Sequence, residues 1–280
     1  MQTIRSITKM QASSRQLASN GRTIAIVPTM GFLHEGHTAL IKRAKKEADV
    51  VIVTIFVNPA QFAPNEDFKK YPRDEKGDLR KIKAAGGDIV FIPKEAEMYP
   101  KDFQTYVTVE NLTKTLEGEH RPTHFRGVTT IVAKLFNICR PEVAIFGMKD
   151  YQQAIVLKRM TRDLGYPVKY IVAPTVREPD GLAMSSRNKY FNSTQRIEAR
   201  CLFYALRTAK ELVKSGETNV LRLEKEVRDV IKATSPTAKI DYIAFTEFET
   251  LKPVKKISKG DVCSLAAVVH GVRLIDNVRF

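Results

Sequence analysis

Cysteine is scarce in this sequence of 280 residues. It occurs three times, at Cys139, Cys201 and Cys263, with no CxxC pair and no histidine nearby at zinc-finger spacing. An odd and scattered set excludes a disulfide framework and a structural zinc site. Because secreted proteins rarely leave a cysteine unpaired, we expect buried thiols in a reducing, cytoplasmic compartment.

Long apolar runs are also missing. The N-terminal segment MQTIRSITKMQASSRQ lacks the apolar core of a signal peptide, and the most apolar run, Val50–Val57, has only the length of a strand. A membrane helix needs roughly 20 apolar residues. We therefore expect a soluble protein with no membrane partner.

Acidic residues are fewer than basic ones. The sequence has 31 Asp and Glu against 46 Lys and Arg, a net charge of +15 at pH 7. The excess is spread evenly, since residues 1–176 hold 27 basic and 18 acidic groups and residues 177–280 hold 19 and 13. Nucleic-acid-binding proteins typically concentrate basic residues in a patch or arm. The even spread instead favours solubility or attraction of small anions.

Short apolar runs alternate with amphipathic helical stretches through residues 1–176. In residues 37–48, for example, Leu40, Ile41 and Ala44 share one helical face and basic residues occupy the other. Helices are also expected over 74–85, 125–139 and 150–164, and the apolar runs are Thr23–Val27, Val50–Val57, Ile89–Ile92, Val143–Phe146 and Val168–Val172. This alternation predicts an α/β domain with a doubly wound parallel sheet. Ligands of such sheets bind beyond the carboxyl ends of the strands.

The pattern changes in residues 177–280. Two helical stretches are followed by three strand-like runs: Ser193–Ser215, Val220–Ala233, then Ile240–Phe245, Val262–Val269 and Val272–Asp276. They predict a smaller C-terminal α+β domain, and the length of the chain leads us to expect that this domain is a compact lid. The polar segment Val176–Asn188 between the two domains is typical of a linker or mobile loop.

The strongest local motif is PTMGFLHEGH, which follows the first apolar strand. Its two histidines, His34 and His37, are three residues apart and fall on one side of a first helical turn. Together with the amide groups and positive dipole of a helix N-terminus they form a phosphate-binding arrangement. Gly36 leaves room for a nucleotide to approach the backbone. The alternative is a pair of surface histidines beside a turn.

Two further polar segments follow apolar strands. Asn58 and Gln61 in NPAQF suit a small substrate that carries hydroxyl and carboxylate groups, although a hydrogen-bonded turn explains them as well. In FGMKDYQQ, Lys149 offers a point charge for phosphate, and Asp150 offers a ribose contact or a helix cap. Gln153 lies one helical turn beyond Lys149. A cap and a surface lysine are the plain alternative.

A fourth segment, Met184-Ser185-Ser186-Arg187-Asn188, combines two hydroxyls with a guanidinium, which is a phosphate-binding set. Its position in a glycine-bearing stretch suggests a loop that closes over substrate, and a solvated serine-rich turn is the alternative. Three of the four segments follow strands of the predicted sheet, and the fourth lies at the domain junction. We therefore expect one cleft to hold all four.

The motifs PTMGFLHEGH, IFVNPAQF, NEDFxxYPR, LEGEHRPTHFRGV, FGMKDYQQ and REPDGLAMSSRN closely resemble, in this order, those of the pantothenate synthetase (pantoate–β-alanine ligase) family. The resemblance spans nearly the whole chain and implies a Rossmann-like first domain. HEGH and MSSR resemble the two signatures of the HIGH/KMSKS nucleotidyltransferase superfamily. The implied reaction joins (R)-pantoate to β-alanine at the expense of ATP, with Mg²⁺, through pantoyl adenylate, and releases AMP and pyrophosphate.

The resemblance also implies roles for individual residues. His37 is the expected proton donor, Gln61 the residue shared by pantoate and β-alanine, and Gln153 a second pantoate contact. The ATP contacts it implies are Met30, Gly31, Phe32, Leu33, His34, Glu35, Gly36, His37, Gly147, Met148, Lys149, Asp150, Val176, Met184, Ser185, Ser186 and Arg187. The cationic or hydrogen-bonding groups suited to the growing phosphate charge are His34, His37, Lys149 and Arg187.

No protein metal ligand is expected, because the sequence around Asp78 has fewer acidic residues than is usual for the family, so Mg²⁺ would arrive on the ATP phosphates. At most, Asp78 would contact it through water. The resemblance further implies a homodimer formed through the first domain.

Two other functions compete with the ligase. A tRNA-acting protein of the same superfamily would explain HEGH and the positive charge, but 104 residues after the first domain are few for reading tRNA and the basic residues are not clustered. A non-enzymatic module, either nucleotide-sensing or structural, would bind ATP without pantoate-dependent pyrophosphate exchange.

Overall fold

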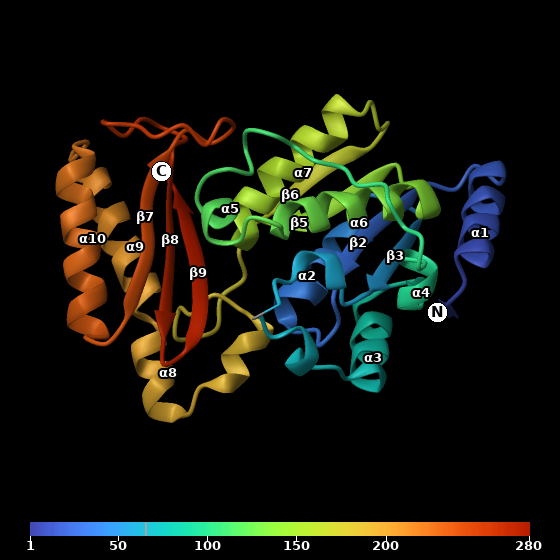
Figure 1. Ribbon diagram of the computed structural model, residues 1–280, viewed down its shortest axis with the longest axis horizontal. Coiled ribbons are helices and arrows are strands. Elements are labelled where there is room, and N and C mark those ends of the chain that lie inside the picture. The colour runs from blue at the N-terminus through green and yellow to red at the C-terminus, as the bar shows by residue number, and fades with distance from the viewer. Residues whose placement is uncertain (65) are drawn as a thin grey trace. The chain divides into compact units, whose positions relative to one another are not determined.

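The computed structural model describes residues 1–64 and 66–280, which form two compact units (Figure 1). Unit 1 comprises Met1–Gly147 and Gln153–Pro174, and unit 2 comprises Met148–Gln152 and Thr175–Phe280. Asn65, the first residue of the NEDF motif, lies outside the described residues. The domain boundary at residue 176 stays a prediction, and each unit is described by itself below.

Unit 1 is built on six parallel strands in the order β1-β4-β3-β2-β5-β6. Their bounds are β1 Gln2–Ile4, β2 Ile24–Thr29, β3 Val50–Ile55, β4 Ile89–Phe91, β5 Val143–Gly147 and β6 Lys169–Ala173. Every apolar run expected in residues 1–176 is a strand, and the predicted doubly wound class is confirmed. Only β1 was not predicted, because three residues are too few to show a periodic pattern.

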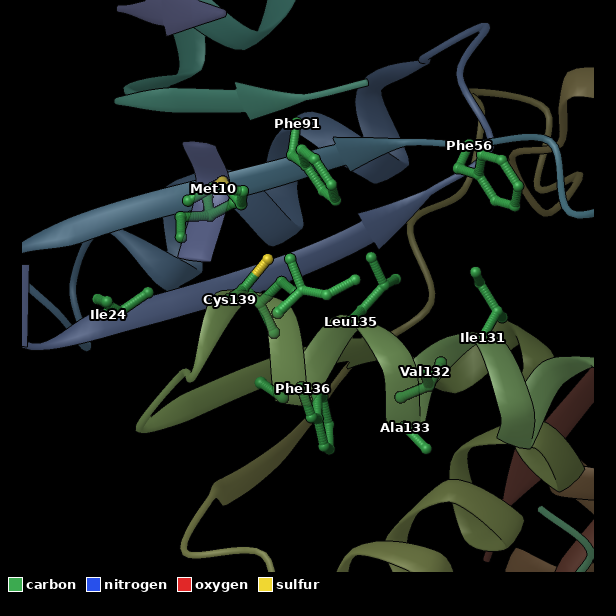
Figure 2. Close-up of a cluster of buried hydrophobic side chains, with 14 of the residues drawn as sticks. Met10, Ile24, Phe56, Phe91, Ile131, Val132, Ala133, Leu135, Phe136 and Cys139 are labelled. Carbon is green, nitrogen blue, oxygen red and sulfur yellow. The ribbon is translucent and has the colours of Figure 1, made fainter. Parts of the chain in front are cut away.

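Helices pack on both faces of this sheet. They are α1 Ile7–Ser19, α2 Glu35–Ala44, α3 Glu75–Ala85, α4 Glu95–Met98, α5 Glu117–His120, α6 His124–Cys139 and α7 Tyr151–Asp163, with short 3-10 turns η1 Pro59–Gln61 and η2 Phe68–Lys70. Ile24 of β2 packs with Met10 of α1 and Leu135 of α6 in one apolar cluster (Figure 2). The next residue, Ala25, faces the other way, into the cluster of α2 and α3. Alternate side chains therefore fill two separate cores.

The strand order reverses between β2 and β5. From β2 the chain proceeds to β3 and β4 on one side of the sheet, and β5 and β6 lie on the other side. Loops that leave the carboxyl ends of β3, β2 and β5 therefore start from three adjacent strands. In doubly wound sheets, this reversal point is where ligands bind.

Unit 2 contains an antiparallel sheet in the order β7-β8-β9 and three helices. The bounds are β7 Lys239–Thr246, β8 Val262–Val269, β9 Val272–Arg279, α8 Ser193–Ala199, α9 Cys201–Lys214 and α10 Val220–Thr234, and two 3-10 turns are η3 Met148–Asp150 and η4 Ser186–Tyr190. The smaller α+β part is thus confirmed. All three cysteines of the chain are free and buried, as expected.

Two predicted elements of unit 2 were wrong in extent. The single helix expected over Ser193–Ser215 is interrupted at Arg200. Ala199 and Cys201, on either side of Arg200, are both fully buried. Strand β9 continues past Asp276 to Arg279. The prediction ended it at Asp276; Asp and Asn, which occupy positions 276 and 277, are residue types depleted in strands.

Among the described residues, no helix is both long enough and apolar enough to cross a membrane.

Candidate active site

The loop Met30–Leu33 connects β2 to α2 and has an unusual backbone. Gly31 and Phe32 both adopt positive φ angles, 83° and 50°. A Cβ at position 31 would lie 3.0 Å from Oδ2 of Asp78 and 3.0 Å from Cγ2 of Ile55. Glycine is required here both for its conformation and for its lack of a side chain. The loop is therefore tightly enclosed.

Asp78 of α3 holds this loop from the side. Its side chain is buried, Oδ2 accepts a hydrogen bond from the amide of Phe32 at 2.8 Å, and Oδ1 accepts one from Leu33 at 2.7 Å. Nζ of Lys81 donates to the Leu33 carbonyl at 2.6 Å. Burial raises the pKa of Asp78, and the two amide bonds oppose this rise. From the sequence, Asp78 was expected only as a water-mediated metal contact, and neither its hold on the loop nor that of Lys81 was foreseen.

His34 and His37 lie at the start of α2, as the motif predicted. His34 is the N-cap residue, and its backbone N–H donates to Nδ1 of His37 at 3.3 Å. The two imidazole rings lie 4.1 Å apart, centroid to centroid. This backbone hydrogen bond is one half of a capping box, with histidine where Glu or Gln is usual. It fixes Nδ1 of His37 as an acceptor, so the neutral ring carries its proton on Nε2.

Gln61 follows β3 and is oriented through a chain of hydrogen bonds. Nδ2 of Asn58 donates to the Gly127 carbonyl and to Oε1 of Gln61, both at 3.0 Å. The hydroxyl of Tyr99 donates to Oδ1 of Asn58 at 2.7 Å. A backbone carbonyl can only accept, so these contacts fix both amide orientations. Nε2 of Gln61 is thereby directed to Sδ of Met30, 3.2 Å away.

The backbone of Gln61 is held by the RPTHF motif. Nδ1 of His124 lies 3.0 Å from the Gln61 carbonyl, and Nη1 of Arg121 lies 3.3 Å from Nε2 of the same imidazole. Arg121 also pairs with Glu66 at 2.6 Å. Burial, assisted by the charge of Arg121, lowers the pKa of His124 to about 4. The ring is therefore neutral, with Nδ1 donating and Nε2 accepting, and none of these residues was assigned a role from the sequence.

The remaining predicted residues of unit 1 lie at the end of β5, the strand next to β2, and at the start of α7. Gly147 is the last residue of β5, and Gln153 is half-buried in the first turn of α7. The predicted segments of unit 1 thus leave β2, β3 and β5, which are adjacent strands. Direct contact is shown for Gln61 with Met30, and for His34 with His37.

Unit 2 holds the other predicted residues. Met148, Lys149 and Asp150 form the turn η3, with Nζ of Lys149 3.6 Å from Oδ1 of Asp150. The carbonyls of Met148 and Lys149 accept hydrogen bonds from the side chain of Asn277, at 2.9 and 3.0 Å. The turn is therefore anchored to β9.

The segment from Val176 to Arg187 is a hydrogen-bonded turn. The amide of Met184 donates to the Val176 carbonyl at 3.1 Å, and Oγ of Ser185 caps η4 by accepting from the Arg187 amide at 3.3 Å. Side chains also fasten it: Arg177 pairs with Asp276, and Arg196 pairs with Glu178. Ser186 is buried. The free linker that its composition suggested is thus a fastened element of unit 2.

Within residues 1–64 and 66–280, no group of three or more His, Cys, Asp and Glu side chains is placed to hold a metal ion. Both oxygens of Asp78 already accept amide hydrogen bonds. The described residues therefore offer no preformed cage for Mg²⁺.

Comparisons with a family model and with relatives of known name point to the same family. Residues 2–279 match the family model described as pantoate-beta-alanine ligase. The chain is 51% identical over 278 residues to the pantothenate synthetase of Moorella thermoacetica, covering 99% of this chain and 97% of that one. It is 49% identical over 277 residues to the pantothenate synthetase of Geobacter sulfurreducens, covering 99% and 98%.

Solved structures agree. The pantothenate synthetase of Thermus thermophilus superposes with a TM-score of 0.95 at 42% identity and covers 100% of this chain and 99% of that one. The pantoate-beta-alanine ligase of Francisella tularensis, complexed with beta-gamma ATP and beta-alanine, gives a TM-score of 0.78 at 34% identity, covering 100% and 97%.

Proposed function

The chain belongs to the pantoate–β-alanine ligase family, and on that premise we propose how its own residues perform the ATP-dependent condensation of pantoate with β-alanine. The contact between Nε2 of Gln61 and Sδ of Met30, 3.2 Å apart, carries the proposal. It brings the Gln61 amide, which we propose binds a carboxylate, against the loop that leads into the N-terminus of α2. A carboxylate and the phosphates of ATP would therefore be bound side by side.

In the first step, a carboxylate oxygen of pantoate attacks the α-phosphorus of ATP. The bond from that phosphorus to the bridging oxygen breaks, and pyrophosphate leaves with the electron pair. Negative charge grows on the phosphate oxygens. His34, His37, Lys149 and Arg187 are the donors and cations proposed to stabilise this charge, which is commonly the largest contribution to catalysis.

His37 is proposed as the proton donor to the phosphates. Its Nδ1 accepts the His34 amide hydrogen, so the exchangeable proton of the neutral ring is on Nε2. The N-terminus of α2 adds aligned backbone amides, which favour a phosphate. The proposed ATP contacts along this loop are Met30, Gly31, Phe32, Leu33, His34, Glu35, Gly36 and His37.

Unit 2 supplies the second proposed set of ATP contacts. Lys149 and Arg187 carry positive charge, and Ser185 and Ser186 add hydroxyls of the kind that bind phosphate. This second set comprises Gly147, the last residue of β5 in unit 1, with Met148, Lys149, Asp150, Val176, Met184, Ser185, Ser186 and Arg187. Most of these residues lie on the anchored turn η3 or the anchored segment from Val176 to Arg187.

In the second step, the amine of β-alanine attacks the acyl carbon of pantoyl adenylate. AMP leaves, and the amine loses a proton as the amide forms. Gln61 is proposed to bind pantoate and then β-alanine, and Gln153 is proposed as a second pantoate contact. Holding the two reactants in register supplies the proximity contribution.

Mg²⁺ is proposed to enter on the ATP phosphates, because it keeps several waters and binds readily to substrate phosphates, and it would neutralise phosphate charge there. A cytoplasmic location is proposed because three buried, free thiols suit a reducing compartment. A homodimer stays a prediction that light scattering tests.

Oxygen labelling tests the proposal. The purified chain is supplied with β-alanine, Mg-ATP and pantoate whose carboxylate carries oxygen-18. Attack at the α-phosphorus transfers one labelled oxygen to the phosphate of AMP, with one AMP formed per pantothenate. Formation of ADP, with the label in inorganic phosphate, would overturn it.

A further inference from the structure

Asn277 of β9 is buried in a position that binds a backbone turn. It is 5% exposed, and its Nδ2 donates to two successive carbonyls, those of Met148 at 2.9 Å and Lys149 at 3.0 Å. Both amide hydrogens of one side chain are thus committed to the turn η3. These two hydrogen bonds fix the backbone from which the Lys149 side chain departs.

Asp276, the preceding residue, binds a different segment. It is 4% exposed and forms a two-point ion pair with Arg177, in which Oδ2 lies 2.6 Å from Nη1 and Oδ1 lies 3.0 Å from Nη2. Nη1 of Arg177 also donates to the Gly181 carbonyl at 3.1 Å. This pair holds the base of the turn that leads to Met184 and Arg187.

The two contacts come from opposite faces of one strand. Side chains alternate along β9, and Asp276 lies on the face of Leu274 and Val278, which belong to the apolar cluster of unit 2. Asn277 therefore lies on the other face. β9 is an edge strand of the three-stranded sheet, so segments from both faces can meet around its unpaired side. The amide of Asn277 also donates to Oδ1 of Asp276 at 2.8 Å, which couples the two residues.

We propose that Asp276 and Asn277 are positioning residues that set Lys149 and Arg187 in register with each other. This inference rests on the proposed function, in which Lys149 and Arg187 bind the phosphates of ATP. Neither β9 residue is proposed to touch the reacting atoms. A phosphate chain needs its cations at fixed separation, and one rigid strand that carries both anchors supplies it.

The first test replaces Asn277 by alanine and by serine. Alanine removes both hydrogen bonds, and serine can restore one. We expect kcat/KM for ATP to fall roughly 10- to 100-fold in Asn277→Ala, as for misplaced catalytic groups, and to fall less in Asn277→Ser. KM for pantoate should not change, because the proposed pantoate contacts lie in unit 1. Asn277→Ser also keeps the test available if the alanine variant does not fold.

The second test replaces Asp276 by asparagine, which keeps the shape but removes the charge paired with Arg177. Asp241→Asn is the matched control, because Asp241 pairs with Arg273 on the same strand β9 at 2.7 Å and anchors neither segment. We expect Asp276→Asn to lower kcat/KM for ATP and Asp241→Asn to leave it unchanged. Equal losses in the two variants would show a general effect on the sheet and overturn the proposal.

A double-mutant cycle with Lys149→Ala separates positioning from other roles. If Asn277 acts through Lys149, adding Asn277→Ala to Lys149→Ala should change kcat/KM by no more than about twofold. If Lys149→Ala lowers kcat/KM and Asn277→Ala has no effect, the positioning inference is wrong and the proposed function stands. The same conclusion follows if the loss of kcat/KM in the double variant equals the product of the losses in the two single variants. If Lys149→Ala is fully active, the proposed role of Lys149 fails and the inference fails with it.

Discussion

The hydroxyl of Tyr99 donates a 2.7 Å hydrogen bond to Oδ1 of Asn58. Burial raises the pKa of Tyr99 well above its usual value, so the hydroxyl stays protonated and remains a donor. The bond fixes the Asn58 amide from one side, as the Gly127 carbonyl does from the other. The amide of Gln61 is oriented in turn, with its NH₂ group directed to Met30. The group that Gln61 would offer to the proposed substrate is therefore a donor, which suits a carboxylate or hydroxyl oxygen.

Tyr99→Phe tests this chain of hydrogen bonds. The variant leaves Oδ1 of the buried Asn58 without its donor, which should lower the free energy of unfolding by about 1–3 kcal/mol. We expect KM for pantoate to rise roughly fivefold, as for the loss of one hydrogen bond, and KM for ATP to stay the same. Tyr166→Phe is the control. The Tyr166 hydroxyl lies 3.5 Å from the carbonyl of Ala133, which is on α6 but away from the Gly127 carbonyl that Asn58 binds. A drop in stability with unchanged pantoate KM would contradict the orienting role.

A pair of variants at His37 separates capping from proton donation. Glutamine at this third helical position can still accept the His34 amide hydrogen, whereas alanine cannot. Both variants should lower kcat by roughly 10²- to 10⁴-fold, because neither has a proton donor of suitable pKa. Only His37→Ala should lose about 0.5–2 kcal/mol of stability, measured by urea unfolding. Activity retained in His37→Gln would mean that His37 is needed for the helix cap and not for catalysis.

Asp78→Asn tests the hold on the Met30–Leu33 loop. Asparagine has only one oxygen, so its NH₂ group would face the backbone N–H of either Phe32 or Leu33. That backbone N–H would lose its acceptor. We expect unfolding to become easier by about 1–3 kcal/mol and kcat/KM for ATP to fall by roughly 10- to 100-fold. Asp74→Asn, at the N-cap of the same helix, is the control. Asp74 accepts from the Gly77 amide at 2.9 Å, and asparagine caps as well as aspartate, so equal losses in the two variants would contradict a specific hold on the loop.

His124 predicts a pH dependence of stability. Its pKa is about 4 in the folded chain, against an ordinary value of 6.5, so the unfolded chain binds the proton first as pH falls. The contribution of neutral His124 is present above pH 6.5 and is lost between pH 6.5 and pH 4. The loss amounts to about 3 kcal/mol at the lower end of this window. Urea unfolding of the wild type and of His124→Asn at several pH values in this window measures the loss. Equal slopes of the free energy of unfolding against pH in the two proteins would contradict the role given to His124.

The sheet and its order of elements could be predicted from the sequence because the strands are continuously apolar and the helices amphipathic. Elements that depend on tertiary packing could not. β1 has three residues, the break at Arg200 lies between two buried residues, and the end of β9 carries the polar pair Asp276 and Asn277. In each case, distant contacts override local preference.

The site shows the same division. Motifs revealed side chains suited to chemistry, such as His37 and Gln61. The residues that hold the site segments, Asp78, Tyr99, His124 and Asn277, lie between 41 and 129 positions from their partners in sequence. An isolated aspartate or tyrosine has no local signal of such a role. A buried polar residue becomes informative only when its partners are known.

Pantoate-dependent exchange of labelled pyrophosphate into ATP, without β-alanine, tests the central claim most directly because it isolates the adenylation step. We predict rapid exchange that requires pantoate and that falls in Lys149→Ala and His37→Ala. Exchange without pantoate, or none in an active preparation that forms pantothenate, would contradict it.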